Sequence, residues 1–481
     1  MSAVTTTRRT RRTVWLASLM VLSLGVAACG ARWDDDQRAE VAARGHGTSS
    51  GSASTDGAAT DGSGGATGDA TGTTLPGSTG GGGTTGGTGG IGSTGGATGG
   101  TGGSGGVIGA STKPCAAASK APGVSDSTIT FGTISSLSGP VPGLGQSALD
   151  AVRAYAAYRN ATGGICGRKL AVQSADDGTD AGRYRSLVND LNSKVIGLAG
   201  GLGGGDSGGA ATVVQLGMPV VAGHISRQMQ EAATMFPVNP KFANVHAVIG
   251  KYRWLHDQGV KTAAVVYLGI DQTRYEVLEK QIPQMEAAGI KIVNKQELPL
   301  STLSYDSAAR GVANSKADYL FFLADYTQSA SMAHAMADTG YKLKFAEYLT
   351  AYSTKFPQLA GAGAEGAISW IRALPNEEPT NPLQKQFLSW MAKVAPNSPA
   401  DSFAADAWVA ANAWAEALEG LKGPISRPAV IAQLKTMNAY DAGGFFGRIQ
   451  LGRKLNNGCF IAMRYESGHW KRLVPASGFM C

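Results

Sequence analysis

Hydrophobic positions repeat with two different periods from Thr128 to the end of the chain. Apolar residues at every second position, as in residues 129–133, are typical of strands, and apolar residues three or four positions apart, as in residues 149–156, are typical of helices. Strands are expected at residues 129–133, 170–172, 195–199, 219–222, 263–268, 291–293, 319–323 and 344–349. Helices are expected between and after them at residues 149–161, 180–191, 245–256, 275–288, 307–313, 329–338, 404–421 and 427–437.

This alternation predicts an α/β fold with two doubly wound parallel-sheet lobes, because it runs through two successive series of βαβ units. Two lobes joined by several crossings of the chain enclose a cleft, and ligands bind at the carboxyl ends of parallel strands. The chain is expected to close with an antiparallel hairpin, residues 459–465 and 469–473, around a Glu-Ser-Gly turn. Trp408 and Trp414 lie on one predicted helix and are expected in the core.

Residues 1–29 have the organisation of a bacterial export signal. Arginine occupies four of the first twelve positions, and the mostly apolar residues 14–26 that follow are too few for a comfortable membrane span. The segment ends Val26-Ala27-Ala28-Cys29, which resembles a lipobox, whose cysteine receives lipid. A plain signal peptide with a chance cysteine, an uncleaved anchor and twin-arginine export remain alternative interpretations.

Residues 30–112 are predicted to form a disordered tether. Of the 68 glycines in the chain, 28 lie between Gly45 and Gly109, and no charged residue occurs between Asp69 and Lys113. A segment of this composition has too little apolar surface to offset the loss of chain entropy on folding. The tether is expected to hold the folded part near the membrane face.

Residues 113–481 are long enough to bury two cores. Lobe 1 is expected to comprise residues 113–245 and 370–442, and lobe 2 residues 246–369 and 443–481. The chain has 42 Lys and Arg against 35 Asp and Glu, a net charge of +7, and the excess lies in this part without any basic run. The charge pattern therefore argues against nucleic acid as the main partner.

The five cysteines fit an oxidising compartment outside the cytoplasm. Cys29 is assigned to lipid, which leaves Cys115, Cys166, Cys459 and Cys481 and three possible pairings. Sequence proximity and the predicted hairpin favour a disulfide between Cys459 and Cys481, which leaves Cys115 to pair with Cys166. A zinc site is the competing interpretation, but no Cys-x-x-Cys occurs and the six histidines are scattered, so no metal is expected.

The glycine-rich segment of residues 200–209, GGLGGGDSGG, matches three motifs at once. The dinucleotide-binding pattern G-x-G-x-x-G carries little information here, because a loop with so many glycines matches it easily. The acidic residue that such sites carry about twenty positions later is absent from residues 220–226, so nucleotide binding is not expected. The match to the nucleophile loop of chymotrypsin-like proteases fails because the only upstream histidine is His46, in the tether.

Ser207 also fits G-x-S-x-G, the nucleophile elbow of serine hydrolases. His224, His246, His256 and His334 lie downstream as possible bases. The other interpretation is an anion-binding nest, made by the hydroxyl and by backbone N–H groups at a helix N-terminus. The nest is favoured because it needs no catalytic partner.

Several short segments occur in a specific order and spacing: Ile129-Thr130-Phe131-Gly132, Ser138-Gly139-Pro140, Asn160 to Leu170, Asp176-Asp177, Gly217 to Val221, Tyr305-Asp306-Ser307, Phe403 to Ala407 and Gly447-Arg448-Ile449. Together they resemble the leucine/isoleucine/valine-binding family of extracytoplasmic solute-binding proteins, which serve ABC importers. The resemblance covers nearly all of Val124 to Leu473. It implies the type I periplasmic binding protein fold, in which two lobes close on an amino-acid-like ligand.

The resemblance also implies a set of ligand contacts. The Ser207 loop matches the segment whose serine and backbone N–H groups hold the ligand carboxylate. His224 and Ser226 match a pair that supplies a backbone carbonyl and a hydroxyl. Tyr275 and Tyr326 match aromatic cleft residues of the second lobe, with the capping of strand ends as their alternative role.

Two positions depart from the family pattern. Leu349 stands where the family has the glutamate that pairs with the ligand ammonium, and Leu144 replaces an aromatic residue in the first cleft loop. A buried ammonium without a carboxylate partner is costly. Either Glu347 serves after a shift of two residues, or the ligand lacks an α-amino group.

The sequence thus predicts a solute-binding lipoprotein that captures a branched-chain amino acid, or a related small amide or carboxylate, by lobe closure. It is expected to be a monomer without cofactor or enzymatic activity, anchored through Cys29 to the outer face of the cell membrane and partnered by an ABC permease. A secreted serine hydrolase using Ser207 and a ligand-sensing receptor domain without a permease are the alternatives.

Overall fold

A computed structural model of the protein describes residues 121–141, 144–223, 225–244 and 249–481. The chain divides into two units, Met1–Ala97 and Thr98–Cys481, and every described residue belongs to the second unit. The predicted export signal, lipid-bearing Cys29, tether and Cys115 lie outside the described residues.

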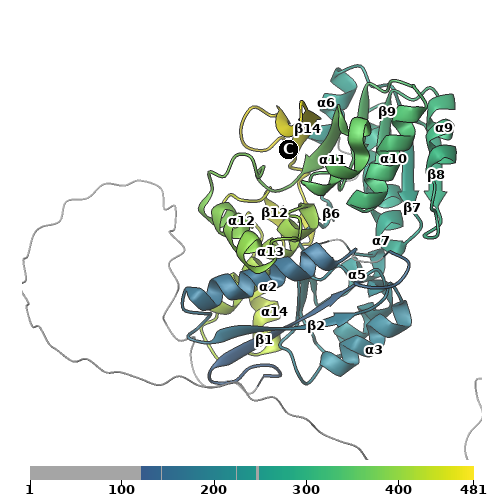
Figure 1. Cartoon of the computed structure of the whole chain (residues 1–481). Coiled ribbons are helices and arrows are strands. Elements are labelled where there is room, and N and C mark those ends of the chain that lie inside the picture. The colour runs from purple at the N-terminus through teal and green to yellow at the C-terminus, as the bar shows by residue number, and fades with distance from the viewer. Residues whose placement is uncertain (1–120, 142–143, 224, 245–248) are drawn as a thin grey trace, which may run out of the picture. The chain divides into compact units, whose positions relative to one another are not determined.

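The first lobe is built on a five-stranded parallel sheet with strand order β2-β1-β3-β4-β5 (Figure 1). Its strands are β1 (Thr128–Ser135), β2 (Lys169–Asp176), β3 (Leu198–Ala199), β4 (Val220–Ala222) and β5 (Met235–Pro237). Its helices are α2 (Gln146–Ala161), α3 (Ala181–Leu191), the 3-10 turn η1 (Asp206–Gly209), α4 (Ala210–Gln215), α5 (Arg227–Glu231), α12 (Pro382–Val394), α13 (Ser402–Glu419) and α14 (Arg427–Thr436).

The second lobe is built on a seven-stranded sheet with strand order β15-β14-β11-β10-β9-β7-β8. Its strands are β7 (Thr262–Leu268), β8 (Lys291–Leu298), β9 (Tyr319–Leu323), β10 (Phe345–Tyr348), β11 (Ala367–Ile371), β14 (Ile461–Glu466) and β15 (His469–Val474). Its helices are α6 (Gly250–Asp257), α7 (Asp271–Arg274), the π-helix η2 (Tyr275–Gln281), α8 (Ile282–Ala287), α9 (Asp306–Asn314), α10 (Tyr326–Asp338), α11 (Lys355–Ala360) and the 3-10 turn η3 (Gly361–Ala364).

The chain crosses between the lobes, as the alternation of elements predicted. After β11 it returns to the first lobe, where α12 packs on α2 and α13 packs on α2, β3 and β4. A small sheet of β12 (Ile449–Gln450), β13 (Leu455–Asn456) and β6 (Lys241–Phe242) joins segments that lie far apart in the sequence. The chain ends with the antiparallel hairpin of β14 and β15 beside β11. The predicted α/β fold and terminal hairpin are confirmed.

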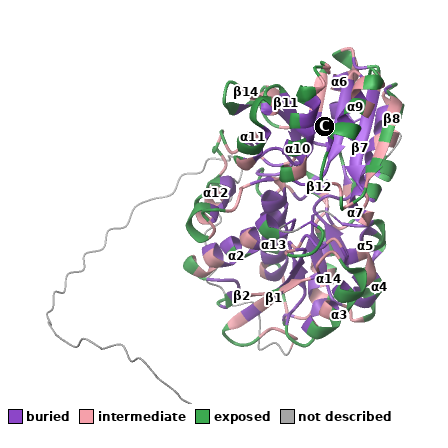
Figure 2. Ribbon diagram, turned by 45° about the vertical axis from the view of Figure 1, so that its right-hand side comes forward, coloured by how far each residue is buried: buried purple, intermediate pink, exposed green. Residues whose placement is uncertain are grey.

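Helix α13 lies at the centre of the first lobe and is buried on almost every side (Figure 2). Such a helix is apolar all round, unlike an amphipathic surface helix. Trp408 and Trp414 have no exposed surface, and the Trp414 indole N–H donates to the Leu198 carbonyl over 2.9 Å. Both tryptophans therefore belong to the core, as predicted.

The disulfide Cys459–Cys481 is present and links the loop between β13 and β14 to residue 481. Cys166 is also disulfide-bonded, and its predicted partner Cys115 lies outside the described residues. One of the two predicted pairings is thus confirmed.

Several helices begin earlier than the sequence pattern indicated, and the largest shift is at the helix after β7. The helix expected from Tyr275 starts four residues before it, at Asp271, directly after Gly269 and Ile270. Thr273 turns its hydroxyl towards the Ile270 N–H over 3.4 Å, and the acidic Asp271 in the first turn favours a helix N-terminus. The shift changes which side chain of this segment lies in the cleft.

Candidate functional site

Two adjacent cavities lie between the lobes. Cavity A has a volume of about 40 Å³ and is lined by Val141, Leu144, Leu202 and Phe403 from lobe 1 and by Leu268, Ile270, Gln272, Thr273, Glu276, Leu323, Ala324 and Asp325 from lobe 2. Cavity B has a volume of about 290 Å³ and is lined by Leu144, Gln146, Ser147, Asp150, Asp325, Tyr326, Thr327, Asn397, Ser398, Pro399, Asp401 and Phe403. Because they share Leu144, Asp325 and Phe403, the two cavities are adjacent, and together they are called the cleft below; cavity A is its more apolar part.

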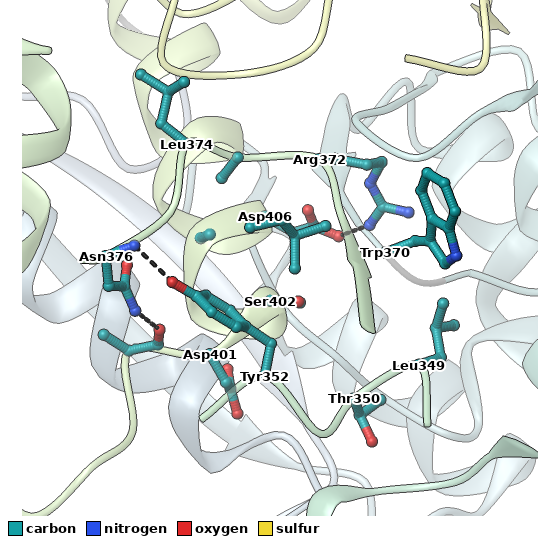
Figure 3. A pocket seen from close by; sticks show the side chains of 14 residues that line it. Leu349, Thr350, Tyr352, Trp370, Arg372, Leu374, Asn376, Asp401, Ser402 and Asp406 are labelled. Atoms are coloured by element: carbon teal, nitrogen blue, oxygen red, sulfur yellow. Dashed lines mark hydrogen bonds and ion pairs between the residues drawn. The ribbon is translucent and has the colours of Figure 1, made fainter. Parts of the chain in front are cut away.

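A third cavity, C, lies where the chain leaves β11 and approaches α13 (Figure 3). Arg372 forms an ion pair with Asp406 across it, and the Asn376 side chain donates to the Ala400 carbonyl over 2.8 Å. Its volume of about 20 Å³ has room for roughly one or two water molecules. Cavities A and B are therefore the better candidate for a ligand site.

The glycine-rich loop of lobe 1 is tied to its own lobe. The Gly204 N–H donates to Ser136 Oγ over 2.8 Å, and the Gly205 N–H donates to Asp177 Oδ2 over 2.9 Å. Ser207 lies on η1, partly exposed. Two N–H groups of the proposed nest are thus already bonded by the protein, and Ser207 lines neither cavity A nor cavity B.

Asp206 connects this loop to both Ser226 and the second lobe. Its carboxylate accepts hydrogen bonds from the Ser226 N–H at 3.0 Å and from Gln272 Nε2 at 2.9 Å. Burial raises the pKa of Asp206 to about 7. The hydrogen bonds from Ser226 favour the charged form and only partly offset this effect. The buried Ser226 also caps α5, because its hydroxyl accepts from the Met229 N–H over 3.3 Å.

The two predicted aromatic residues take different positions. Tyr326 is the first residue of α10, follows the capping residue Asp325 and lines cavity B. Tyr275 is buried at the start of η2 with Lys280 Nζ 5.6 Å from its ring centroid, and it lines neither A nor B. His224 lies outside the described residues. The structure therefore brings Tyr326 to the cleft and leaves Tyr275 beside it.

Glu347 lies on β10 in the interior of lobe 2 with no exposed surface. It forms an ion pair with Lys251 over 2.6 Å and accepts a hydrogen bond from the Tyr319 hydroxyl. Its carboxylate is thus neutralised by the protein itself, and it lines none of cavities A, B and C. Leu349, two residues later, lines cavity C.

The polar groups of cavity A have partners within the protein, with one exception. Burial opposes the ionisation of Glu276, but Lys280 at 2.5 Å outweighs it and lowers the pKa of Glu276 to about 2. Asp325 accepts from the N–H groups of Thr327 and Gln328 as the cap of α10. Among the described residues, Gln272 Oε1 is buried without a hydrogen-bond partner. An apolar wall with one unpaired buried acceptor beside it can hold a small, mostly apolar molecule.

A family model for periplasmic binding proteins matches residues 128–469 of the chain. The chain belongs to the periplasmic binding protein family. No curated relative matches the sequence. Members of this family bind their ligands and are typically not enzymes, in agreement with the prediction of a non-enzymatic protein.

Solved structures share the fold of this periplasmic binding protein at low sequence identity. A fatty acid ABC transporter substrate-binding protein from Thermomonospora curvata is 19% identical with a TM-score of 0.64, over 76% of this chain and 95% of that one. A substrate-binding periplasmic protein from Ralstonia solanacearum is 19% identical with a TM-score of 0.62, over 72% and 100%. A leucine-binding protein from Thermotoga maritima is 12% identical with a TM-score of 0.60, over 72% and 98%.

The surroundings of the described histidines bear on the hydrolase alternative. His256 lies 3.2 Å from Lys261 Nζ, His334 3.8 Å from Asp338, and His469 3.1 Å from the Ser467 carbonyl. None of these contacts involves Ser207. The described residues also contain no group of three or more His, Cys, Asp or Glu side chains that could hold a metal ion. No described helix has the length and apolar character to cross a membrane.

Sequence reasoning did not single out Asp206 or Gln272 as site residues. Asp206 precedes the serine that carried the motif matches, and Gln272 precedes the predicted start of its helix at Tyr275. The acidic Asp271 at the first helical position was the available signal for the earlier start. With the helix begun there, Gln272 would have been placed at the carboxyl end of β7, where ligands bind.

Proposed function

We propose that the protein is the substrate-binding component of an ABC importer and captures a small ligand with a branched apolar body and no α-amino group. The ligand class is an amide or carboxylate related to the branched-chain amino acids. It binds in cavities A and B and is enclosed when the two lobes close.

The pairing of Glu347 with Lys251 carries this proposal. An α-ammonium group in an apolar cleft needs a carboxylate partner, since an unpaired buried charge is strongly disfavoured. Glu347 is held by Lys251 at 2.6 Å and has no exposed surface, and Leu349 replaces the family's glutamate. Glu347 is thus not available to pair with the ammonium group of an amino acid, while the walls of cavity A suit an apolar body.

The comparisons support the importer role. The structures that share the fold include proteins described as ABC transporter substrate-binding proteins for a fatty acid and as a leucine-binding protein. An apolar ligand body is common to both descriptions. The predicted lipid anchor at Cys29 would place the protein on the outer membrane face beside its permease.

Cleft roles are proposed for the residues that sequence analysis assigned. Tyr326 at cavity B has the most direct support, because it lines the cleft. Ser226 contributes through Asp206, to which its N–H donates. Ser207, His224 and Tyr275 remain proposed contacts on the basis of the family resemblance.

Thermal unfolding of the purified protein with a ligand panel tests the ligand class. The panel holds leucine, isoleucine and valine beside 4-methylpentanoate, 4-methyl-2-oxopentanoate and 4-methylpentanamide. A ligand at 100 times its Kd stabilises the folded state by about 2.7 kcal/mol. Stabilisation by the compounds without an amino group, and not by leucine, is expected; stabilisation by leucine at least as large would contradict the proposal.

Uptake by the producing cells separates an importer from a sensor. Cells that lack the protein are expected to lose saturable uptake of the compound that stabilises it. Undiminished uptake together with a lost transcriptional response would instead establish the receptor alternative.

A further inference from the structure

The side chain of Gln272 bridges the two lobes from the start of α7. It is only 5% exposed, and its amide nitrogen Nε2 donates to Asp206 Oδ1 over 2.9 Å and to the Gly203 carbonyl over 2.8 Å. Both partners belong to the glycine-rich loop of lobe 1. The contact therefore forms only when the second lobe lies against the first.

The two partners fix which way the Gln272 amide faces. The Gly203 carbonyl can only accept, so the group of the Gln272 amide that faces it must be the NH2 donor. The oxygen Oε1 then has to point the other way. It is buried and has no hydrogen-bond partner among the described residues, and Gln272 lines cavity A. A buried acceptor of this kind is costly until a donor reaches it.

The charges around cavity A favour a neutral donor over an ammonium group. Glu276 is paired with Lys280 at 2.5 Å, and Asp325 caps α10 by accepting from Thr327 and Gln328. Asp206 already accepts from Ser226 and from Gln272 itself. A cationic ligand group would have to displace these donors from the carboxylates. It would also be repelled by the nearby positive charge of Lys280.

We propose that Gln272 is a specificity-determining residue whose Oε1 accepts a hydrogen bond from a neutral N–H or O–H group of the ligand. The ligand would then be a primary amide or an alcohol on a branched apolar body. The inference rests on the proposed function, since it assumes a ligand without an ammonium group in cavities A and B. Through its Nε2, the same side chain couples recognition of the donor to lobe closure.

Two compounds of equal shape test the donor directly. 4-Methylpentanamide and 5-methylhexan-2-one differ only in an NH2 group that is replaced by CH3. Isothermal titration of the purified protein is expected to give about tenfold or more tighter binding of the amide, because the ketone leaves Oε1 unpaired. Equal affinity for the two compounds would overturn the assignment.

A variant shows whether Gln272 causes the preference. Gln272→Met keeps a long flexible side chain without the amide, and its preference for the amide over the ketone is expected to fall to about twofold or less. Gln258→Met, which changes an exposed glutamine of the same lobe, should retain the wild-type preference. If Gln272→Met unfolds, as judged by circular dichroism, the amide-to-ketone ratio of the wild-type protein still decides.

The panel separates failure of this inference from failure of the proposed function. Tight binding of 4-methylpentanoate and of the ketone, with no advantage for the amide, would refute the role of Gln272 and leave the proposed ligand class intact. Tight binding of leucine alone would refute both. No binding by any compound of the panel would count against both as well.

Discussion

The glycine-rich loop of lobe 1 and the start of α7 in lobe 2 differ in how their polar groups are satisfied. In the loop, the N–H groups of Gly204 and Gly205 are bonded to Ser136 and Asp177 of the same lobe. At the start of α7, Gln272 has a buried oxygen without a partner among the described residues. Backbone groups that are already bonded hold the loop in shape, whereas an unbonded buried group gains when a ligand donor reaches it. The start of α7, which matches no sequence motif, is therefore the better candidate for ligand recognition.

The glycines of the lobe 1 loop have a structural reason. A Cβ atom at Gly205 would lie 2.3 Å from the Asp180 carbonyl oxygen, and one at Gly208 would lie 2.0 Å from the Ala181 carbonyl oxygen. Both approaches are far below van der Waals contact. The loop is rich in glycine because its backbone packs directly against the start of α3.

The largest expected effect concerns the interior of lobe 2. Glu347→Leu leaves the buried Lys251 without its partner, and loss of one member of a buried ion pair costs about 3–5 kcal/mol of unfolding free energy. Chemical denaturation measures this loss. Glu286→Gln, at an exposed position of the same lobe, should change the free energy by about 0.5 kcal/mol or less.

The double variant Lys251→Met/Glu347→Leu is expected to recover much of that stability, since it removes both charges together. An undestabilised Glu347→Leu protein whose ligand affinity is lost would instead show that Glu347 faces the ligand. That outcome would contradict the proposal that the ligand lacks an α-amino group.

A smaller effect is expected in the glycine-rich loop. Gly205→Ala forces the backbone to move away from Asp180 and should lower the unfolding free energy by about 1–3 kcal/mol, the usual cost of overpacking. Gly423→Ala is the matched control, because a Cβ there meets nothing within 4 Å. Were the loop an anion-binding nest alone, Gly205→Ala would weaken ligand binding and leave stability unchanged.

The sequence pattern predicted the fold class and most of the elements but not the site. Most strands of the two large sheets and the terminal hairpin follow from apolar periodicity, and Cys459–Cys481 follows from proximity, because these depend on local pattern. The strands β5 and β11 and the helix α12 were not predicted. The partner of Glu347 could not be predicted, since Lys251 lies 96 positions away and meets it only through the fold. Gln272 was not predicted as a site residue because the helix after β7 was expected to begin at Tyr275, four residues after its actual start at Asp271.

The smallest effect is a pH dependence of the contact at Asp206. Its pKa is raised by burial from 3.8 to about 7, so between these values the folded protein keeps a proton that the unfolded chain has released. Stability of the wild-type protein therefore falls as pH rises through this window, and Asp206→Asn lacks the transition. The unfolding free energy of Asp206→Asn relative to wild type should rise by about 1 kcal/mol between pH 5 and pH 6. A difference that is constant from pH 4 to pH 7 would show that the carboxyl does not stay protonated in the folded state.

The most direct test of the cleft's chemistry is a titration calorimetry comparison of 4-methylpentanamide with leucinamide at neutral pH. The two compounds differ only in the α-amino group, which is the group that Glu347 would have to neutralise. Because Lys251 holds Glu347, we expect 4-methylpentanamide to bind at least about tenfold more tightly than leucinamide. Equal or tighter binding of leucinamide would contradict it, since the cleft would then hold an ammonium partner after all.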